Sequence, residues 1–154
     1  MRLDRLLDDS VLDGEFTPED LAAVDEAKRR FRDAGPGLLA RITADLWAYY
    51  TATADEFTPQ QRLDYGIPEL PASADIWAEV NVTAPPEITV GQPPHAPGRC
   101  YVSFEGEVSW EPEHGLQLVV EDGRRVCKVG PYDGHVTNAA AFNDLSLLNV
   151  VFRS

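Results

Sequence analysis

The sequence has few cysteines, few basic residues and no long apolar run, and each shortage excludes a class of protein. Cys100 and Cys127 are its only cysteines, and neither belongs to a C-x-x-C pair, which argues against a structural zinc or redox site. Lys and Arg number 13 against 26 Asp and Glu, giving a formal net charge of −13. Nucleic acids and anionic membranes select basic surfaces, so we expect neither as a partner.

The shortage of long apolar segments bears on the cellular compartment. No segment has the apolar length that a transmembrane helix needs. The first residues, MRLDRLLDDSVLDG, lack the apolar core of a signal peptide. We therefore expect a cytoplasmic protein whose two thiols are reduced.

Length and composition are those of an ordinary globular protein. The chain has 154 residues, of which 44% are hydrophobic, and this is enough to bury a core. We predict a single domain over residues 1–154. Its acidity suits cations or a basic protein partner.

The N-terminal part, residues 17–56, has the pattern of two helices. Thr17-Pro18 is a typical helix start, since Thr caps and Pro fits the first helical position. Gly35-Pro36-Gly37 is expected to end the first helix. An apolar stripe at helical spacing predicts a second helix over residues 38–55. Thr58-Pro59 starts a third, shorter helix.

The second part, residues 74–135, has the pattern of an antiparallel sheet. Three strand-like runs lie between Tyr101 and His135, and Asp122-Gly123 suits a two-residue type I′ turn. The strand pairs that this turn predicts are Glu121–Arg124, Val120–Arg125, Val119–Val126, Leu118–Cys127, Gln117–Lys128 and Leu116–Val129. The run LLNVVF (residues 147–152) is expected to be a final strand.

The turn at residues 111–115 predicts the preceding register and therefore the two faces of the sheet. Its predicted pairs are Trp110–Leu116, Val108–Leu118 and Gly106–Val120. The expected core face contains Trp110, Leu116, Leu118, Val120 and Cys127. The outer face then carries Glu105, Glu107 and Glu121, with Glu105 close to Glu121. The predicted fold is α+β, with N-terminal helices packed on one face of a C-terminal antiparallel sheet.

The acidic outer face has two interpretations that the residues leave open. The simpler one is a solvated face, with Arg124 and Lys128 nearby. The alternative is a calcium site, because hard cations take several oxygen ligands. Its candidate ligands are Glu105, Glu107, Glu121, Asp122 and Asp133. No D-x-D-x-D-G loop is present, so such a site is not an EF-hand.

The sequence gives little support for catalysis. Glu113-His114 and Asp133-Gly134-His135 place acids beside histidines, and such groups can move protons. Neither pair has the spacing of a zincin helix, and no G-x-S-x-G or Gly-rich phosphate loop occurs. We therefore predict no catalytic residues, no cofactor and no enzyme activity.

The run Trp110, Glu113, His114, Gly115, Leu116 carries a resemblance. It resembles a widespread bacterial family of unknown function marked by W-x-x-E-H-G-L before a hairpin. One branch of this family also has an upstream D-I-W, here Asp75-Ile76-Trp77. The similarity extends from about Ser73 to Asp144. Relatives often have an acid before the Trp, where this chain has Ser109.

The resemblance implies a protein like the immunity proteins of bacterial polymorphic toxin systems. Such a protein covers the active site of a cognate toxin, and an acidic surface complements a basic one. The expected partner-binding residues are Glu105, Glu107, Glu111, Glu113, His114 and Glu121. Alternatively, the signature is wholly structural: Trp110 and Leu116 close the turn, Gly115 supplies a positive φ, and His114 holds a backbone carbonyl.

Overall fold

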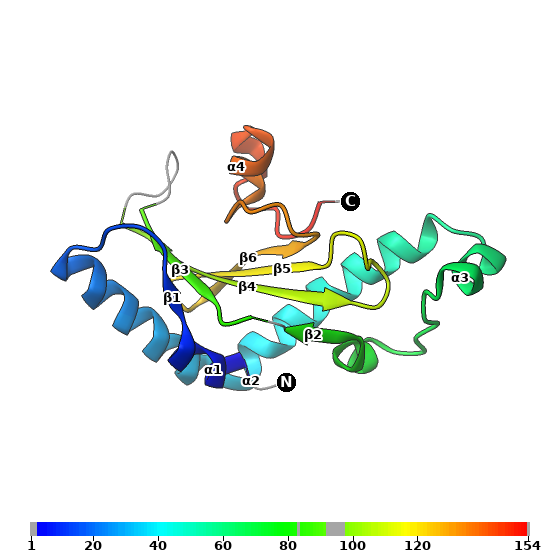
Figure 1. The fold of residues 1–154 in the computed structure, drawn as a ribbon, viewed down its shortest axis with the longest axis horizontal. Coiled ribbons are helices and arrows are strands. Elements are labelled where there is room, and N and C mark those ends of the chain that lie inside the picture. The colour runs from blue at the N-terminus through cyan, green and yellow to red at the C-terminus, as the bar shows by residue number, and fades with distance from the viewer. Residues whose placement is uncertain (1–2, 83, 92–97, 154) are drawn as a thin grey trace.

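The computed structural model describes residues 3–82, 84–91 and 98–153, in which a long helix packs on a six-stranded sheet (Figure 1). The α-helices are α1 (Leu3–Leu6), α2 (Pro18–Asp55), α3 (Pro59–Tyr65) and α4 (Asn138–Phe142). The strands are β1 (Val11–Leu12), β2 (Val80–Val82), β3 (Glu87–Val90), β4 (Cys100–Val108), β5 (Leu116–Glu121) and β6 (Arg125–Gly130). Short 3-10 helices span Leu7–Asp9, Ser73–Glu79 and Leu145–Leu147. The predicted α+β class is confirmed. None of the described helices is long and apolar enough to cross a membrane.

The sheet is mixed, whereas the sequence predicted an antiparallel one. Its order is β1-β3-β4-β5-β6, and β2 and β3 both pair with β4. All pairs are antiparallel except β1 with β3, which is parallel. β1 comes from the acidic N-terminal segment, outside residues 74–135, and its two residues are too few to show a strand pattern. The sheet therefore has an edge strand, β1, that the hydrophobic periodicity of the sequence did not predict.

Local signals set the helices as predicted. Thr17 and Asp20 form a reciprocal capping box, with N–O distances of 2.9 and 3.1 Å. At Gly35, φ is 49° and ψ is −131°, so the helix ladder is interrupted and α2 consists of two helical parts. Thr58 forms a second capping box, and Gly66 ends α3 in the left-handed region.

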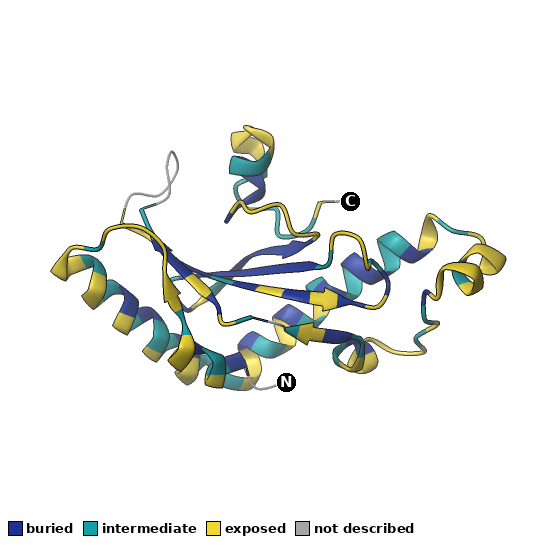
Figure 2. Ribbon diagram, viewed as in Figure 1, coloured by how far each residue is buried: buried dark blue, intermediate teal, exposed yellow. Residues whose placement is uncertain are grey.

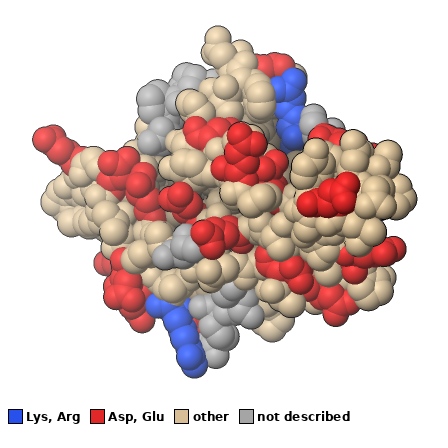
Figure 3. Space-filling model, turned by 45° about the vertical axis from the view of Figure 1, so that its right-hand side comes forward, with Lys and Arg blue, Asp and Glu red and all other residues tan. Residues whose placement is uncertain are grey.

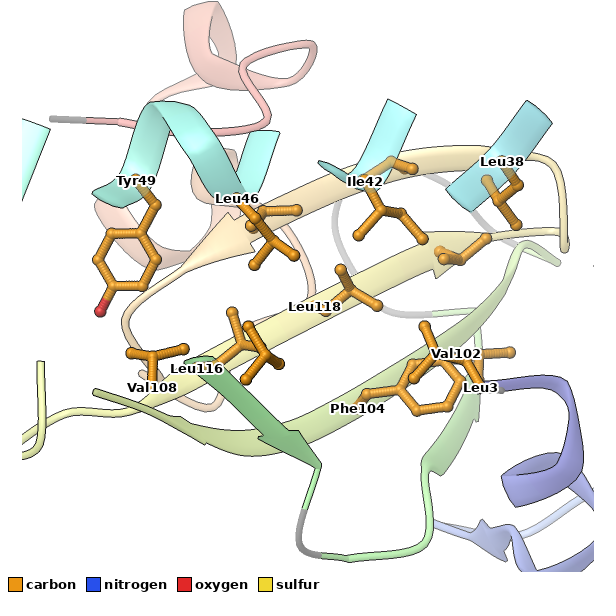
Figure 4. Close-up of a cluster of buried hydrophobic side chains, with 14 of the residues drawn as sticks. Leu3, Leu38, Ile42, Leu46, Tyr49, Val102, Phe104, Val108, Leu116 and Leu118 are labelled. Carbon is orange, nitrogen blue, oxygen red and sulfur yellow. The ribbon is translucent and has the colours of Figure 1, made fainter. Parts of the chain in front are cut away.

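The core lies between both parts of α2 and the inner face of the sheet. Side chains from α2 point at side chains from β4 and β5, and Figure 4 shows this contact layer with Leu38, Ile42, Leu46 and Tyr49 on the helix. Leu46 and Phe104 are completely buried. Trp110 is also buried, and its ring meets Tyr49 edge-on, with centroids 5.5 Å apart. The apolar stripe of α2 therefore packs on the apolar face of the sheet, as predicted.

The predicted register of β4 and β5 is wrong by four residues. Leu116 pairs with Gly106, Leu118 with Phe104, and Val120 with Val102. Because four is even, the same residues still face the core, and the predicted faces of these two strands are correct. Glu121 now lies opposite Tyr101, and Glu105 lies opposite Gln117. The predicted closeness of Glu105 and Glu121 is therefore wrong.

The β5–β6 register also differs from the prediction. Asp122 and Gly123 both have positive φ (52° and 71°), as a type I′ turn requires, and the Arg124 amide donates to the Glu121 carbonyl. However, three residues separate Glu121 from its partner Arg125, and one register shift follows between Val119 and Val120. The actual pairs are Glu121–Arg125, Val120–Val126, Val119–Lys128, Leu118–Val129 and Gln117–Gly130. Cys127 consequently belongs to the outer face, which corrects its predicted place in the core.

Part of the outer face is covered by the chain that follows β6. Residues 131–139 fold over β5 and β6, and Val136 packs with Tyr101, Val119 and Cys127 in a second apolar cluster. β5 is therefore buried along its whole length, whereas β4 alternates between buried and exposed residues (Figure 2). The predicted final strand at residues 147–152 is wrong. The Val151 carbonyl accepts a hydrogen bond from the Val129 amide, but residues 147–152, all of which the structure describes, form no strand.

Candidate functional site

The uncovered part of the outer face contains an acidic pocket, a cavity of about 240 Å³ between β1, β3, β4 and the segment after β6. Three carboxylates line it: Asp13, Glu87 and Glu105. The Asp13 amide donates to the Ile88 carbonyl (2.9 Å), which fixes Asp13 beside β3. Ile88 faces the core, so Glu87 on the same strand faces outward by alternation.

Electrostatics in the acidic pocket disfavour the ionised form of Glu87. Partial burial raises the pKa of Glu87, and the charge and hydrogen bond of Asp13 and the charge of Glu105 raise it further. Among the described residues that line the pocket there is no Lys or Arg. The pocket therefore holds clustered negative charge without a lining cation.

Polar side chains form the floor of the acidic pocket. Thr89 is 5% exposed, and its Oγ1 has no hydrogen-bond partner among the described residues. Ser103 Oγ accepts from Gln117 Nε2 at 3.1 Å. Gln117 is itself held, because its Oε1 accepts from Lys128 Nζ (3.2 Å). The floor is thus a fixed set of polar groups with one unused hydroxyl.

Tyr132 forms part of the wall of the acidic pocket. Its amide donates to the His114 carbonyl (3.2 Å), which ties the wall to the turn before β5. The pKa of Tyr132 is raised by partial burial and then by the charges of Glu105 and Glu87. The residue is 43% exposed, so a ligand can reach it from solvent.

Lys128 anchors the segment that carries this wall. Its Nζ donates to Gln117, to Asp133 Oδ1 and to the His135 carbonyl (2.9 Å). Lys128 is 2% exposed, and burial lowers its pKa while Asp133 opposes that shift. The prediction that Lys128 lies on a solvated face is therefore wrong. The coverage of β6 by residues 131–139 is the reason.

Two predicted partner-binding residues lie on the exposed part of β4. Glu105 and Glu107 are exposed, and neither side chain has an ion pair or hydrogen bond in the described part of the chain. Glu107 lines a shallow hollow with Pro112 and residues of β2. Acidic side chains are widespread on the face drawn in Figure 3, where Lys and Arg are sparse.

The turn after β4 brings three other predicted residues together. Ligand atoms of Glu111, Glu113 and His114 lie within 4.8 Å of one another, which is the one such group among the described residues. Glu111 Oε1 accepts from the amides of Glu113 (3.2 Å) and His114 (3.3 Å) and lies 3.4 Å from His114 Nδ1. These contacts give Glu111 a role in holding the turn.

The other signature residues are structural. Gly115 has φ of +65°, as predicted, and a Cβ there would lie 2.6 Å from the Gly106 carbonyl oxygen. Its own carbonyl accepts from Tyr49 Oη at 2.8 Å. Trp110 and Leu116 are in the core. The His114 side chain is exposed and lies beside Glu111, whereas its backbone carbonyl holds Tyr132.

The five residues predicted as calcium ligands do not form one site. Glu121 is 8% exposed and pairs with Arg125 (2.6 Å), so it also leaves the predicted partner surface. Asp122 accepts from the Cys100 amide (2.9 Å) and pairs with Arg99. Asp133 is bound to Lys128. Only Glu105, of the five, lines the acidic pocket, and Glu107 lines the neighbouring hollow. The register shifts explain this separation.

Sequence reasoning missed most of the acidic pocket. Glu87 and Thr89 flank the buried Ile88, so tracking the polar face of β3 would have found them. Asp13 gave no such signal, because its position depends on the parallel pairing of β1 with β3. Tyr132 also depends on long-range folding, through the segment that Lys128 anchors.

A family model described as a domain of unknown function (DUF6985) matches residues 4–136. The matched range contains the whole of the acidic pocket, from Val11 to Val136. No curated protein and no solved structure matches the chain.

Proposed function

This chain belongs to the family described as a domain of unknown function (DUF6985), and we propose that it is a non-enzymatic module that binds a basic protein. Its mode of action is occlusion, as an immunity protein covers the active site of a cognate bacterial toxin. The observation that carries the proposal is the exposed acid on the outer face of β4, a strand in the interior of the sheet. Glu105 and Glu107 have no cation partner among the described residues, within a chain of net charge −13.

The proposed contact surface, here called the acidic edge, consists of Glu105, Glu107, Glu111, Glu113 and His114. It includes the exposed part of β4 and the turn that follows. Most of these side chains are exposed, and the backbone beneath them is held by the β4–β5 ladder and by the Tyr49–Gly115 hydrogen bond. A rigid acidic edge favours fast association with a basic surface.

A binding role fits the chemistry better than catalysis. Asp133, which the sequence placed beside His135 as a possible proton-transfer group, is bound to Lys128 and also accepts from the His135 amide (2.9 Å). His114 lies on an exposed turn beside Glu111. We place the protein in the cytoplasm, because Cys100 and Cys127 are free, buried thiols and suit a reducing compartment.

The test is protection of cells from a toxin. A toxin encoded beside the gene for this chain is expressed in a sensitive host, with and without the chain. We expect co-expression to restore growth, and the Glu105→Lys/Glu107→Lys variant to restore less at equal abundance. A toxin that kills equally in the presence of the folded wild-type chain would contradict the immunity-like role.

A further inference from the structure

We propose that the acidic pocket binds one arginine side chain presented by a partner protein. This deepens the proposed function, on which it rests, by naming the group that the partner inserts. The proposal joins two independent features: three carboxylates without a lining cation, and a buried hydroxyl without a partner.

The carboxylates define the charge of the ligand. Asp13, Glu87 and Glu105 come from three neighbouring chain segments and line one cavity on the outer face. Like charges brought together oppose folding unless a cation compensates them. A cationic ligand gains attraction to all three groups at once, so the pocket selects positive charge.

Thr89 shows that the pocket is shaped for a hydrogen-bond donor. Its side chain is buried, its Oγ1 has no partner among the described residues, and it lines the same cavity. Buried hydroxyls are normally hydrogen-bonded, and an exception calls for a ligand or a water. Thr89 and Glu87 both flank the core residue Ile88, so the Thr89 side chain faces the side of β3 from which a donor enters between the carboxylates.

The geometry favours a guanidinium over a metal ion. Three ligand atoms within 4.8 Å of one another occur at Glu111, Glu113 and His114 in the described chain, and not among the pocket carboxylates. A cavity of about 240 Å³ also exceeds the space of a bare ion. Guanidinium is planar and spreads five N–H donors, which suits acceptors that are spaced apart.

The wall of the pocket adds a preference for arginine over lysine. Tyr132 offers a partly exposed aromatic ring beside the carboxylates. Arginine stacks on aromatic faces while its N–H groups remain free to donate, whereas lysine carries a compact, strongly hydrated charge. The expected order of affinity is therefore arginine, then lysine, then a neutral isostere.

The direct test uses the full chain and N-acetyl-arginine amide, followed by two-dimensional amide NMR. We expect saturable shifts centred on the amides of Thr89, Ser103 and Glu105. N-acetyl-citrulline amide has nearly the same shape without the charge and should give none. Equal shifts with the citrulline compound would overturn the proposal. Displacement of the arginine probe by calcium chloride, at a calcium concentration below that of the probe, would also overturn it.

Two variants separate the pocket from general charge. Glu105→Gln should weaken the arginine probe about tenfold, the loss expected for one charge-assisted hydrogen bond. Glu107→Gln is the matched control: it removes the same charge from the same strand, but Glu107 does not line the pocket. Equal effects of the two variants would contradict the assignment. Thr89→Val tests the hydroxyl, with the NMR spectrum of the free variant reporting its fold.

The outcomes also distinguish this site from the proposed function. If the arginine probe binds as described while the toxin test fails, the pocket assignment holds and its protein partner is of another kind. If the chain protects against a toxin but Glu105→Gln and Thr89→Val leave both the probe and the toxin affinity unchanged, the pocket assignment is wrong.

Discussion

Gly115 shows how one residue decides the turn that leads into β5. Its φ of +65° lies in the left-handed region, and the Gly106 carbonyl oxygen occupies the place of a side chain. Gly66 has a similar φ of +69° but open space around it. A comparison of substitutions at the two glycines therefore separates the energetic cost of backbone strain from the cost of a close atomic contact.

For Gly115→Ala we expect a loss of about 2–5 kcal/mol of unfolding free energy, which combines left-handed strain with overpacking. Gly66→Ala, the control, should cost about 1–2 kcal/mol from strain alone. Urea denaturation followed by tryptophan fluorescence measures both. Equal costs would mean that the Gly106 contact is unimportant.

The two thiols report the packing of both apolar clusters. Burial, as the main cause, raises the pKa of Cys100 and of Cys127 to about 12, from 9.0. At pH 8 their thiolate fraction is therefore about a thousandfold below that of the unfolded chain. We expect a disulfide reagent to label the native protein slowly and the urea-unfolded protein fast. Rapid labelling of both thiols in the native state would contradict this packing.

The same thiols predict how stability changes with pH. Well below pH 9 the folded and unfolded chains both keep nearly all the thiol protons, so the thiols add almost no pH dependence there. From pH 9 to about 12 only the unfolded chain loses them, so the free energy of unfolding falls as pH rises. Buried Tyr49 and Tyr101 act in the same direction, because burial also raises their pKa. A Cys100→Ala/Cys127→Ala variant should show a shallower alkaline decline in melting temperature.

At the scale of elements, local signals were readable from the sequence and long-range ones were not. The Thr17 cap and the Gly35 break depend on neighbours in the chain, and both were predicted correctly. Strand faces were also predicted for β4 and β5, because period-2 alternation survives a slip of four residues. The register itself depended on a five-residue turn, which permits several pairings.

The candidate site was harder to predict than the fold for the same reason. The alternation of β4 predicted that Glu105 faces outward. Its neighbours Asp13 and Tyr132 follow β1 and β6 in the chain, and only the tertiary fold brings them beside Glu105. Glu121 was misplaced because the actual register sets it opposite Tyr101, away from Glu105, and Arg125 forms an ion pair with it. Register shifts, and the covering of a strand by a distant segment, are difficult to predict from a single sequence.

The covering segment gives a prediction at this scale. Lys128→Met removes the cation that joins Gln117, Asp133 and the His135 carbonyl, so we expect a loss of about 3–5 kcal/mol, as for other broken buried pairs. Arg124→Met is the control, because it removes an exposed charge in the same hairpin. Adding Asp133→Asn to Lys128→Met should cost less than the separate losses combined. Additive losses would contradict the pairing.

At the scale of the whole molecule, the sheet separates stability from recognition. Its inner face packs on α2, and residues 131–139 cover β5 and β6 on the outer face. The remaining outer surface holds the acidic pocket and, beside it, the acidic edge. Charge on this surface can therefore change without disturbing the core, which makes binding and folding separable by mutation.

The kinetics of association with the partner test the binding role of the acidic edge most directly. With a toxin that the chain neutralises, stopped-flow rates are measured at increasing salt for the wild type and for Glu105→Lys/Glu107→Lys. Exposed charges are screened within about 10 Å at 0.1 M salt. We therefore expect the wild-type on-rate to fall steeply with salt, and the folded variant to associate at least about tenfold more slowly at low salt. An on-rate indifferent both to salt and to the charge reversals would contradict recognition through the acidic edge.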